Sequence, residues 1–179
     1  MTDRAPAYPE ISAQDTARRL TDSFRSVEWA VSIVPPQWTH ALPDYYGPND
    51  WTVAMNLAHL VVYEEKFATP LLEALAAGDD GEGAVPSPGE GWLLRDATAI
   101  ASEPVEVLLE RLANSRARQV QIVESFPRDR FNEPVTPLWA KSPIHGRSLH
   151  SAAWVATKTF QHTWEHGNAI LRIALFAPR

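Results

Sequence analysis

The chain has 179 residues and 45% of them are hydrophobic, so length and composition fit one globular domain and exclude a largely disordered chain. The formal net charge is −6 and no basic run occurs, which argues against nucleic acid as a partner. The sequence has no cysteine, so disulfide bonds and thiolate metal ligands are excluded, and any bound metal must use histidine, carboxylate or water ligands.

We expect residues 1–11 to form a loose N-terminal leader of a single domain that spans residues 1–179. The leader lacks the apolar core of a signal peptide. No run of about 18 apolar residues occurs in the chain, so we expect no membrane partner. Together these features favour a cytoplasmic protein.

The first helix is predicted from about Ala13 to Val34. Ser12 can act as its N-cap, and two consecutive prolines after Val34 end it. Apolar side chains recur at intervals of three and four residues, at Leu20, Phe24, Val27, Val31 and Val34. This period is typical of a helix that buries one face.

The second helix is predicted from Asp50 or Trp51 to Ala77. Its residues 53–63 are apolar nearly all round, which is typical of a helix buried on most sides. Asn56 and His59 are the only strongly polar residues in that stretch. Buried polar side chains need partners, so these two residues indicate a special environment.

The third helix is predicted from about Glu103 to Ser125, after a glycine- and proline-rich loop over residues 78–91. Ser102 is a plausible N-cap, and Pro104 fits the first turn of a helix. A long connection with several prolines follows. Loops of this length in compact domains tend to be lids or binding segments.

The fourth helix is predicted from about Leu149 to Leu175. One stripe of this helix, at spacings of four and three residues, holds Val155, Thr159, His162, His166, Ala169 and Ile173. Both histidines therefore lie in the row that faces the core. Four long helices without a strand signal predict an all-α protein, a four-helix bundle with long connecting loops.

His162 and His166 are four residues apart, so their imidazoles can bind one metal ion from the same helix face. His59, on a second buried helix, can supply a third ligand. Three protein ligands and an open position are typical of catalytic metal sites. The alternative is that the three are core histidines bonded to polar neighbours.

Residues 51–60, WTVAMNLAHL, resemble the first motif of the DinB/YfiT-like family of metal-binding proteins, and residues 162–170, HTWEHGNAI, resemble its closing motif. The resemblance implies a four-helix bundle of unusual connectivity around one divalent ion. Carried over residue by residue, the three metal ligands of the family are His59, His162 and His166. Asn168 stands where many members have glutamine, a change that keeps the amide.

The resemblance also implies functions. Some relatives are thiol S-transferases, in which a metal ion lowers the pKa of a low-molecular-weight thiol. We therefore expect a divalent ion, zinc or nickel before iron or manganese, a thiol cofactor and a small-molecule substrate. The alternatives are a metal-dependent hydrolase and a non-catalytic metal- or ligand-binding protein of stress response. A homodimer is expected by analogy with similar bundles.

For most other residues near the histidines, a structural role is favoured over a role in the site. Glu64 and Glu65 are interpreted as a solvated helix edge rather than as acceptors behind the metal ligands. Arg116 is interpreted as a solvated surface cation. Tyr63 shares a face with His59 and either donates its hydroxyl to a ligand or packs in the core. Residues of the long loops that could border a pocket are Trp92, Trp139, His145 and His150.

Overall fold

The computed structural model describes residues 10–43, 46–47, 50–79, 81, 84–86, 91–133 and 151–176. Its elements are α1 (Ala13–Ser32), the 3-10 helix η1 (Pro36–Trp38), α2 (Val53–Tyr63), the π-helical η2 (Glu64–Ala68), α3 (Thr69–Ala77), α4 (Trp92–Ile100), α5 (Val105–Ser125), α6 (Arg128–Phe131) and α7 (Ala152–Phe176). The predicted all-α class is confirmed. None of the described helices is both long and apolar enough to cross a membrane.

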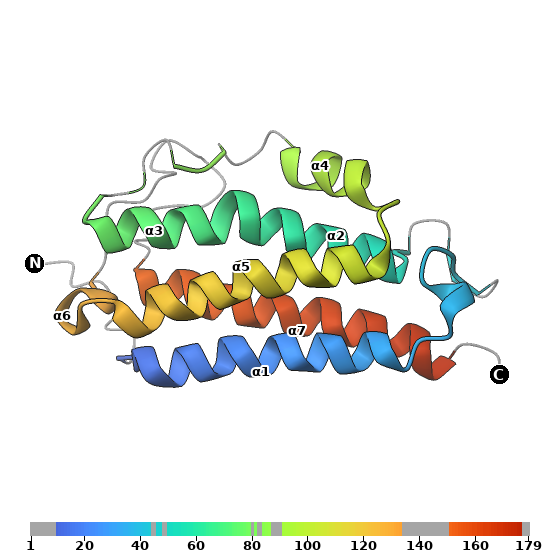
Figure 1. Ribbon diagram of the computed structural model, residues 1–179, viewed down its shortest axis with the longest axis horizontal. Helices are drawn as coiled ribbons and strands as arrows, with labels where there is room; N and C mark the ends of the chain where they lie inside the picture. The colour runs from blue at the N-terminus through green and yellow to red at the C-terminus, as the bar shows by residue number, and fades with distance from the viewer. Residues whose placement is uncertain are drawn as a thin grey trace, which may run out of the picture.

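The long helices form four rods that pack side by side (Figure 1). α1 and α7 run in one direction, whereas α5 and the rod made of α2, η2 and α3 run in the other. α7 packs against α1 and α2, and α5 also contacts both α1 and α2. The predicted four-helix bundle is confirmed, and its second and third rods are parallel because a crossing connection that includes α4 joins them.

α1 shows how local sequence sets a helix end. The side chain of Ser12 accepts a hydrogen bond from the backbone N–H of Asp15, so the predicted N-cap is confirmed. The helix ends at Ser32, two residues before the predicted end. Its apolar stripe faces the core, where Leu20 and Val27 are fully buried.

The second rod changes its helical phase at a single π-helical turn, Glu64–Ala68. The backbone N–H of Thr69 donates to the carbonyl of Glu64, five residues back instead of four. Pro70 follows directly, and a proline in a regular helix has no N–H to donate and crowds the carbonyl four residues back. The wider turn relieves that conflict, so the helix predicted to end at Ala77 is one rod with an extra residue in one turn.

α4 and the start of α5 differ from the prediction. No helix was predicted between the loop after α3 and the third long helix, yet α4 forms there, packs on α2 and buries Trp92. α5 begins at Val105 and not at Glu103, because the residue before Pro104 is held away from helical geometry. The predicted cap at Ser102 is wrong, since no side chain caps α5.

α7 and α1 approach each other closely at Gly167. A Cβ atom built on Gly167 would lie 3.2 Å from Cγ2 of Val27, closer than most real Cβ contacts. The missing side chain therefore lets the two helices pack at short range. The preceding residue, His166, faces the other neighbour of α7, the helix α2, where it contacts Asn56.

Candidate metal centre

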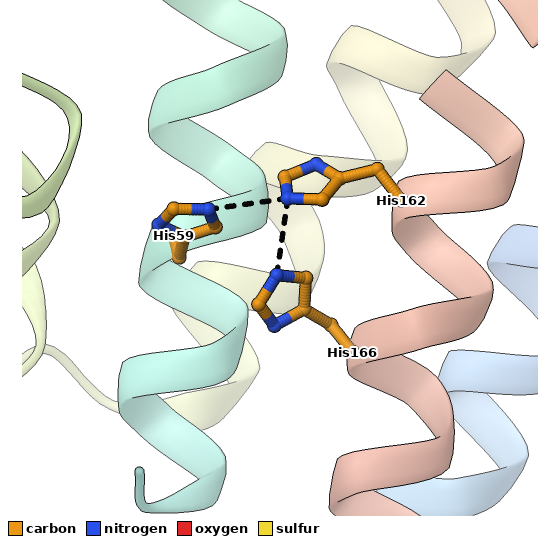
Figure 2. Close-up of side chains that lie close together, drawn as sticks. All are labelled: His59, His162 and His166. Atoms are coloured by element: carbon orange, nitrogen blue, oxygen red, sulfur yellow. Dashed lines mark hydrogen bonds between the residues drawn. The ribbon is translucent and has the colours of Figure 1, made fainter. Parts of the chain in front are cut away.

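Three histidines from two helices come together between α2 and α7 (Figure 2). His59 comes from α2, and His162 and His166 lie one turn apart on α7. Nε2 of His162 lies 3.1 Å from Nε2 of His59 and 3.1 Å from Nε2 of His166. The three predicted residues thus form one cluster with facing Nε2 atoms, and metal binding by them stays a prediction.

The spacing of these nitrogens fits one divalent ion. Two imidazole nitrogens bound to a tetrahedral ion at about 2.0–2.1 Å lie roughly 3.3 Å from each other. The observed separations of 3.1 Å are close to that value. Within the described ranges, no other group of three or more histidine, aspartate or glutamate side chains has ligand atoms so close together. Imidazole ligands suit zinc, nickel, iron and copper, so the cluster can hold a metal ion without identifying it.

Burial keeps the cluster uncharged at neutral pH. It lowers the pKa of His59 from 6.5 to about 4. Burial, and then the charges of His166 and His59, lower the pKa of His162 to about 3. Burial, and then the charge of His59, lower the pKa of His166 to about 4. The three imidazoles are therefore neutral at pH 7, the form that binds metal ions.

The other ring nitrogens of the cluster differ in their partners. Nδ1 of His166 lies 2.8 Å from Oδ1 of Asn56, a residue of α2 that is 2% exposed. Nδ1 of His59 and Nδ1 of His162 are buried and have no hydrogen-bond partner among the described residues. The interpretation as core histidines satisfied by polar neighbours therefore fits His166 but not the other two.

Two aromatic side chains border the cluster. The ring of Trp51 stacks on His166, with centroids 5.6 Å apart and planes at 15°, and its centroid lies 4.9 Å from that of His59. The ring of Tyr63 meets His162 edge-on at 4.5 Å. Burial raises the pKa of Tyr63 above its ordinary value. These contacts favour the interpretation that Tyr63 packs in the core.

A cleft of about 550 Å³ opens beside the cluster, and Trp51, Asn56 and His166 line part of it. Its size is in the range of small-molecule sites. Its charged lining residues include Glu165 and Arg172, both exposed. The cluster is therefore reached from solvent on the side of His166.

A buried polar network that sequence reasoning missed lies in the middle of the bundle. Arg116, 2% exposed, donates from Nε and Nη2 to the carboxylate of the fully buried Glu64. It also donates to Ser23 Oγ at 2.7 Å, to Thr163 Oγ1 at 2.7 Å and to the backbone carbonyl of Leu20. These contacts use the whole hydrogen-bonding capacity of the guanidinium group and tie the four rods together.

The structure corrects the surface positions predicted for Glu64 and Arg116, which are core residues. Burial of each charge depends on the other, because an unpaired ion in the core is very costly. Glu65 is half-exposed and pairs with Arg111 at 2.7 Å, which agrees with its predicted place at a helix edge. Trp92 is buried in α4. Three loop residues, Trp139, His145 and His150, lie outside the described residues.

Comparisons with known proteins agree with this fold. A sequence model of the DinB superfamily matches residues 10–170, which include the three histidines. No curated protein matches the chain. Among solved structures, the chain is similar to the crystal structure of the colibactin self-resistance protein ClbS in complex with a dsDNA. That likeness has a TM-score of 0.67 and 16% sequence identity, and it covers 96% of this chain and 100% of that chain.

The likeness also corrects the prediction of no nucleic-acid partner, which rested on the net charge of −6. A protein of this fold has been crystallised with double-stranded DNA, so the prediction was wrong to exclude nucleic acid. Net charge is a sum over the whole molecule, whereas DNA responds to the local field of one surface. The resemblance seen in the two histidine motifs is confirmed, since the family match spans residues 10–170: the chain belongs to the DinB superfamily.

Proposed function

We propose that this protein is a metal-dependent thiol S-transferase that acts on a small electrophile. The observation that carries the proposal is the convergence of His59, His162 and His166, without a fourth clustered ligand among the described residues. Three protein ligands leave a coordination position open for a reactant. A divalent ion held there would lower the pKa of a thiol and supply a thiolate at neutral pH.

The surroundings of the cluster support a small-molecule reaction. The cleft that His166 lines is large enough for a thiol and a small electrophile. Arg172 is exposed in this cleft and forms no ion pair with any residue that the structure describes. Its guanidinium is therefore available for a thiol that carries carboxylates. We expect zinc or nickel in the site before iron or manganese.

The proposal is tested with metal-depleted protein that is reloaded with each of these four ions. The protein is incubated with bacillithiol, mycothiol or glutathione and a chlorinated aromatic, and the conjugate is measured by mass spectrometry. We expect conjugate from the wild-type chain and only background from His59→Ala. His40→Ala is the matched control, because His40 is exposed and bonds to the carbonyl of Glu103 outside the cluster.

Other outcomes of this experiment, or of the same protein with a panel of hydrolase substrates, would replace the proposal. No conjugate above the His59→Ala background with any thiol would rule out the S-transferase. Turnover of esters, amides or phosphoesters without thiol would make the protein a hydrolase. Stoichiometric metal without any turnover would make it a metal-binding protein with no catalytic role.

A second candidate function is binding to double-stranded DNA, which the likeness to a protein crystallised with dsDNA favours. Fluorescence anisotropy of a short labelled duplex tests it. We expect binding that weakens steeply with salt, because phosphate contacts release counterions. A single-stranded oligonucleotide and the His59→Ala variant serve as controls. No anisotropy change at low salt would remove this candidate.

A further inference from the structure

We propose that Asn56 is a positioning residue that holds His166 in one tautomer, with the proton on Nδ1 and the lone pair of Nε2 facing the cluster. The inference rests on the proposed metal-binding role of the three histidines. Asn56 itself touches no position that a metal ion would occupy between the Nε2 atoms. It contacts His166 on the opposite side of the ring, at Nδ1.

The environment of Asn56 determines which way its amide points. Its Nδ2 lies 2.9 Å from the carbonyl oxygen of Thr52 and 3.3 Å from that of Trp51. Carbonyl oxygens only accept hydrogen bonds, so the amide nitrogen has to face them. The flipped amide would place its own oxygen against both carbonyls and leave its N–H groups without those acceptors. Oδ1 therefore faces His166.

The direction of the amide in turn determines which ring nitrogen of His166 carries the proton. Oδ1 of Asn56 can only accept, and Nδ1 of His166 lies 2.8 Å from it. Nδ1 therefore carries the proton and donates it to this oxygen. A neutral imidazole has one protonated nitrogen, so Nε2 keeps its lone pair, and Nε2 is the atom that faces His162 at 3.1 Å.

The same residues also fix the orientation of the ring. Asn56 is buried in the first turn of α2, and the carbonyls that it binds belong to the residues at the start of that helix. One of these residues, Trp51, stacks on the ring of His166. Two residues at the start of α2 therefore hold the imidazole ring of His166: Asn56 contacts its Nδ1 edge, and Trp51 covers one face. Partners of this kind orient metal-bound histidines and raise their basicity.

The three histidines of the cluster differ in whether Nδ1 has a hydrogen-bond partner. His59 and His162 have no Nδ1 partner in the described part of the chain, so among the three rings only His166 has a protein acceptor at Nδ1. We therefore expect His166 to be the pre-oriented ligand of the three. Asn56→Leu removes the acceptor at nearly constant volume, whereas Asn56→Asp keeps an acceptor oxygen opposite Nδ1.

The test measures the tautomer directly in metal-free, ¹⁵N-labelled protein at neutral pH. Long-range ¹H–¹⁵N correlation spectra distinguish protonated from unprotonated ring nitrogens, and His166→Gln assigns the signals. We expect the Nδ1–H form in the wild-type chain and in Asn56→Asp, and a mixture of tautomers in Asn56→Leu. Zinc affinity, measured by competition with a chromophoric chelator, should fall about 10- to 100-fold in Asn56→Leu and much less in Asn56→Asp.

Gln119→Leu is the matched control, because Gln119 is a fully buried amide that donates to Glu64 and Thr69 and not to a histidine. It should leave both readouts unchanged. An Nε2–H form in the wild-type chain, or Asn56→Leu with unchanged tautomer and affinity, would overturn the proposal. If Asn56→Leu fails to fold, the wild-type and Asn56→Asp spectra still decide. The spectra need no turnover, so failure of the S-transferase assay does not affect this test.

Discussion

His59 and His162 are 103 positions apart in the chain, yet their Nε2 atoms lie 3.1 Å apart across the interface of α2 and α7. Only the folded chain brings the two imidazoles together. An ion that binds both, with His166, binds the native state far better than the unfolded state. Metal binding and folding are therefore expected to be coupled.

Zinc should stabilise the wild-type protein against heat and urea. A free concentration about 100 times the Kd is expected to add roughly 2.7 kcal/mol to the free energy of unfolding. His59→Ala should lose this increment, and His40→Ala should keep it. Circular dichroism in zinc and in chelator measures the effect, and an equal gain in His59→Ala would show that zinc acts elsewhere.

The metal-free protein should lose stability as the pH falls from about 6.5 towards 4. The pKa values of His59, His162 and His166 are about 4, 3 and 4 in the folded chain, below the ordinary 6.5. The unfolded chain therefore binds more protons in this window, and its free energy falls relative to the native state. Above about pH 8 neither state binds protons at the three histidines, so they contribute no slope there.

Urea unfolding in chelator, measured between pH 7 and pH 5, checks this dependence before most carboxylates titrate. His162→Gln removes one of the three groups and should reduce the slope. A slope in His162→Gln equal to that of the wild-type chain would contradict the lowered pKa of His162.

Gly167→Val should destabilise the bundle. A Cβ atom at position 167 would already lie only 3.2 Å from Cγ2 of Val27, and a valine side chain adds further methyl groups at this contact. Overpacking of this kind costs about 1–3 kcal/mol. Gln161→Val is the control, since Gln161 is exposed on the same helix. Urea unfolding measures both variants, and equal stability of the two would mean that α1 and α7 can move apart freely.

Removing one member of the buried ion pair should cost far more than removing both. Arg116→Met leaves the carboxylate of Glu64 buried without its counter-charge, a change that typically costs about 3–5 kcal/mol. The double variant Glu64→Leu/Arg116→Met removes both charges and should be the more stable protein. Free energies of unfolding from urea titrations decide the order.

The control for the buried pair is an exposed pair whose arginine lies on the same helix as Arg116, α5. Arg118 pairs with Glu73 at 2.7 Å, and both side chains are about half-exposed. Arg118→Met should change the free energy of unfolding by less than about 1 kcal/mol, because solvent screens exposed pairs. A cost similar to that of Arg116→Met would mean that burial does not govern the effect.

The histidine cluster could be predicted because its information is local. His162 and His166 share a row with apolar residues on one helix, and His59 lies in an apolar stretch of another, so helical period alone turns them inward. Parallel rods and the approach of α2 to α7 are tertiary facts. The family resemblance implied an unusual connectivity and one ligand set from the two helices, and neither it nor any pattern in the residues predicted the parallel direction of the rods.

The Glu64–Arg116 pair could not be predicted in the same way. Its members are 52 positions apart, and charged side chains usually lie at the surface. The placement of Glu64 also depends on a helical turn of five residues, which a search for regular periods does not detect. α4 was not predicted for another reason. It is short, and its large buried residue, Trp92, is the first residue of the helix.

The π-helical turn Glu64–Ala68 gives the second rod two registers. The part before it presents His59 to α7, and the part after it buries Leu71, Leu72 and Leu75. Each residue advances a regular helix by about 100°. If these residues formed an ordinary helix without losing one of them, the leucines of α3 would turn by about 100° relative to His59. Losing exactly one residue here would instead close the wide turn and keep both parts on their present faces, so a one-residue length difference among homologues within the second rod should fall at this turn.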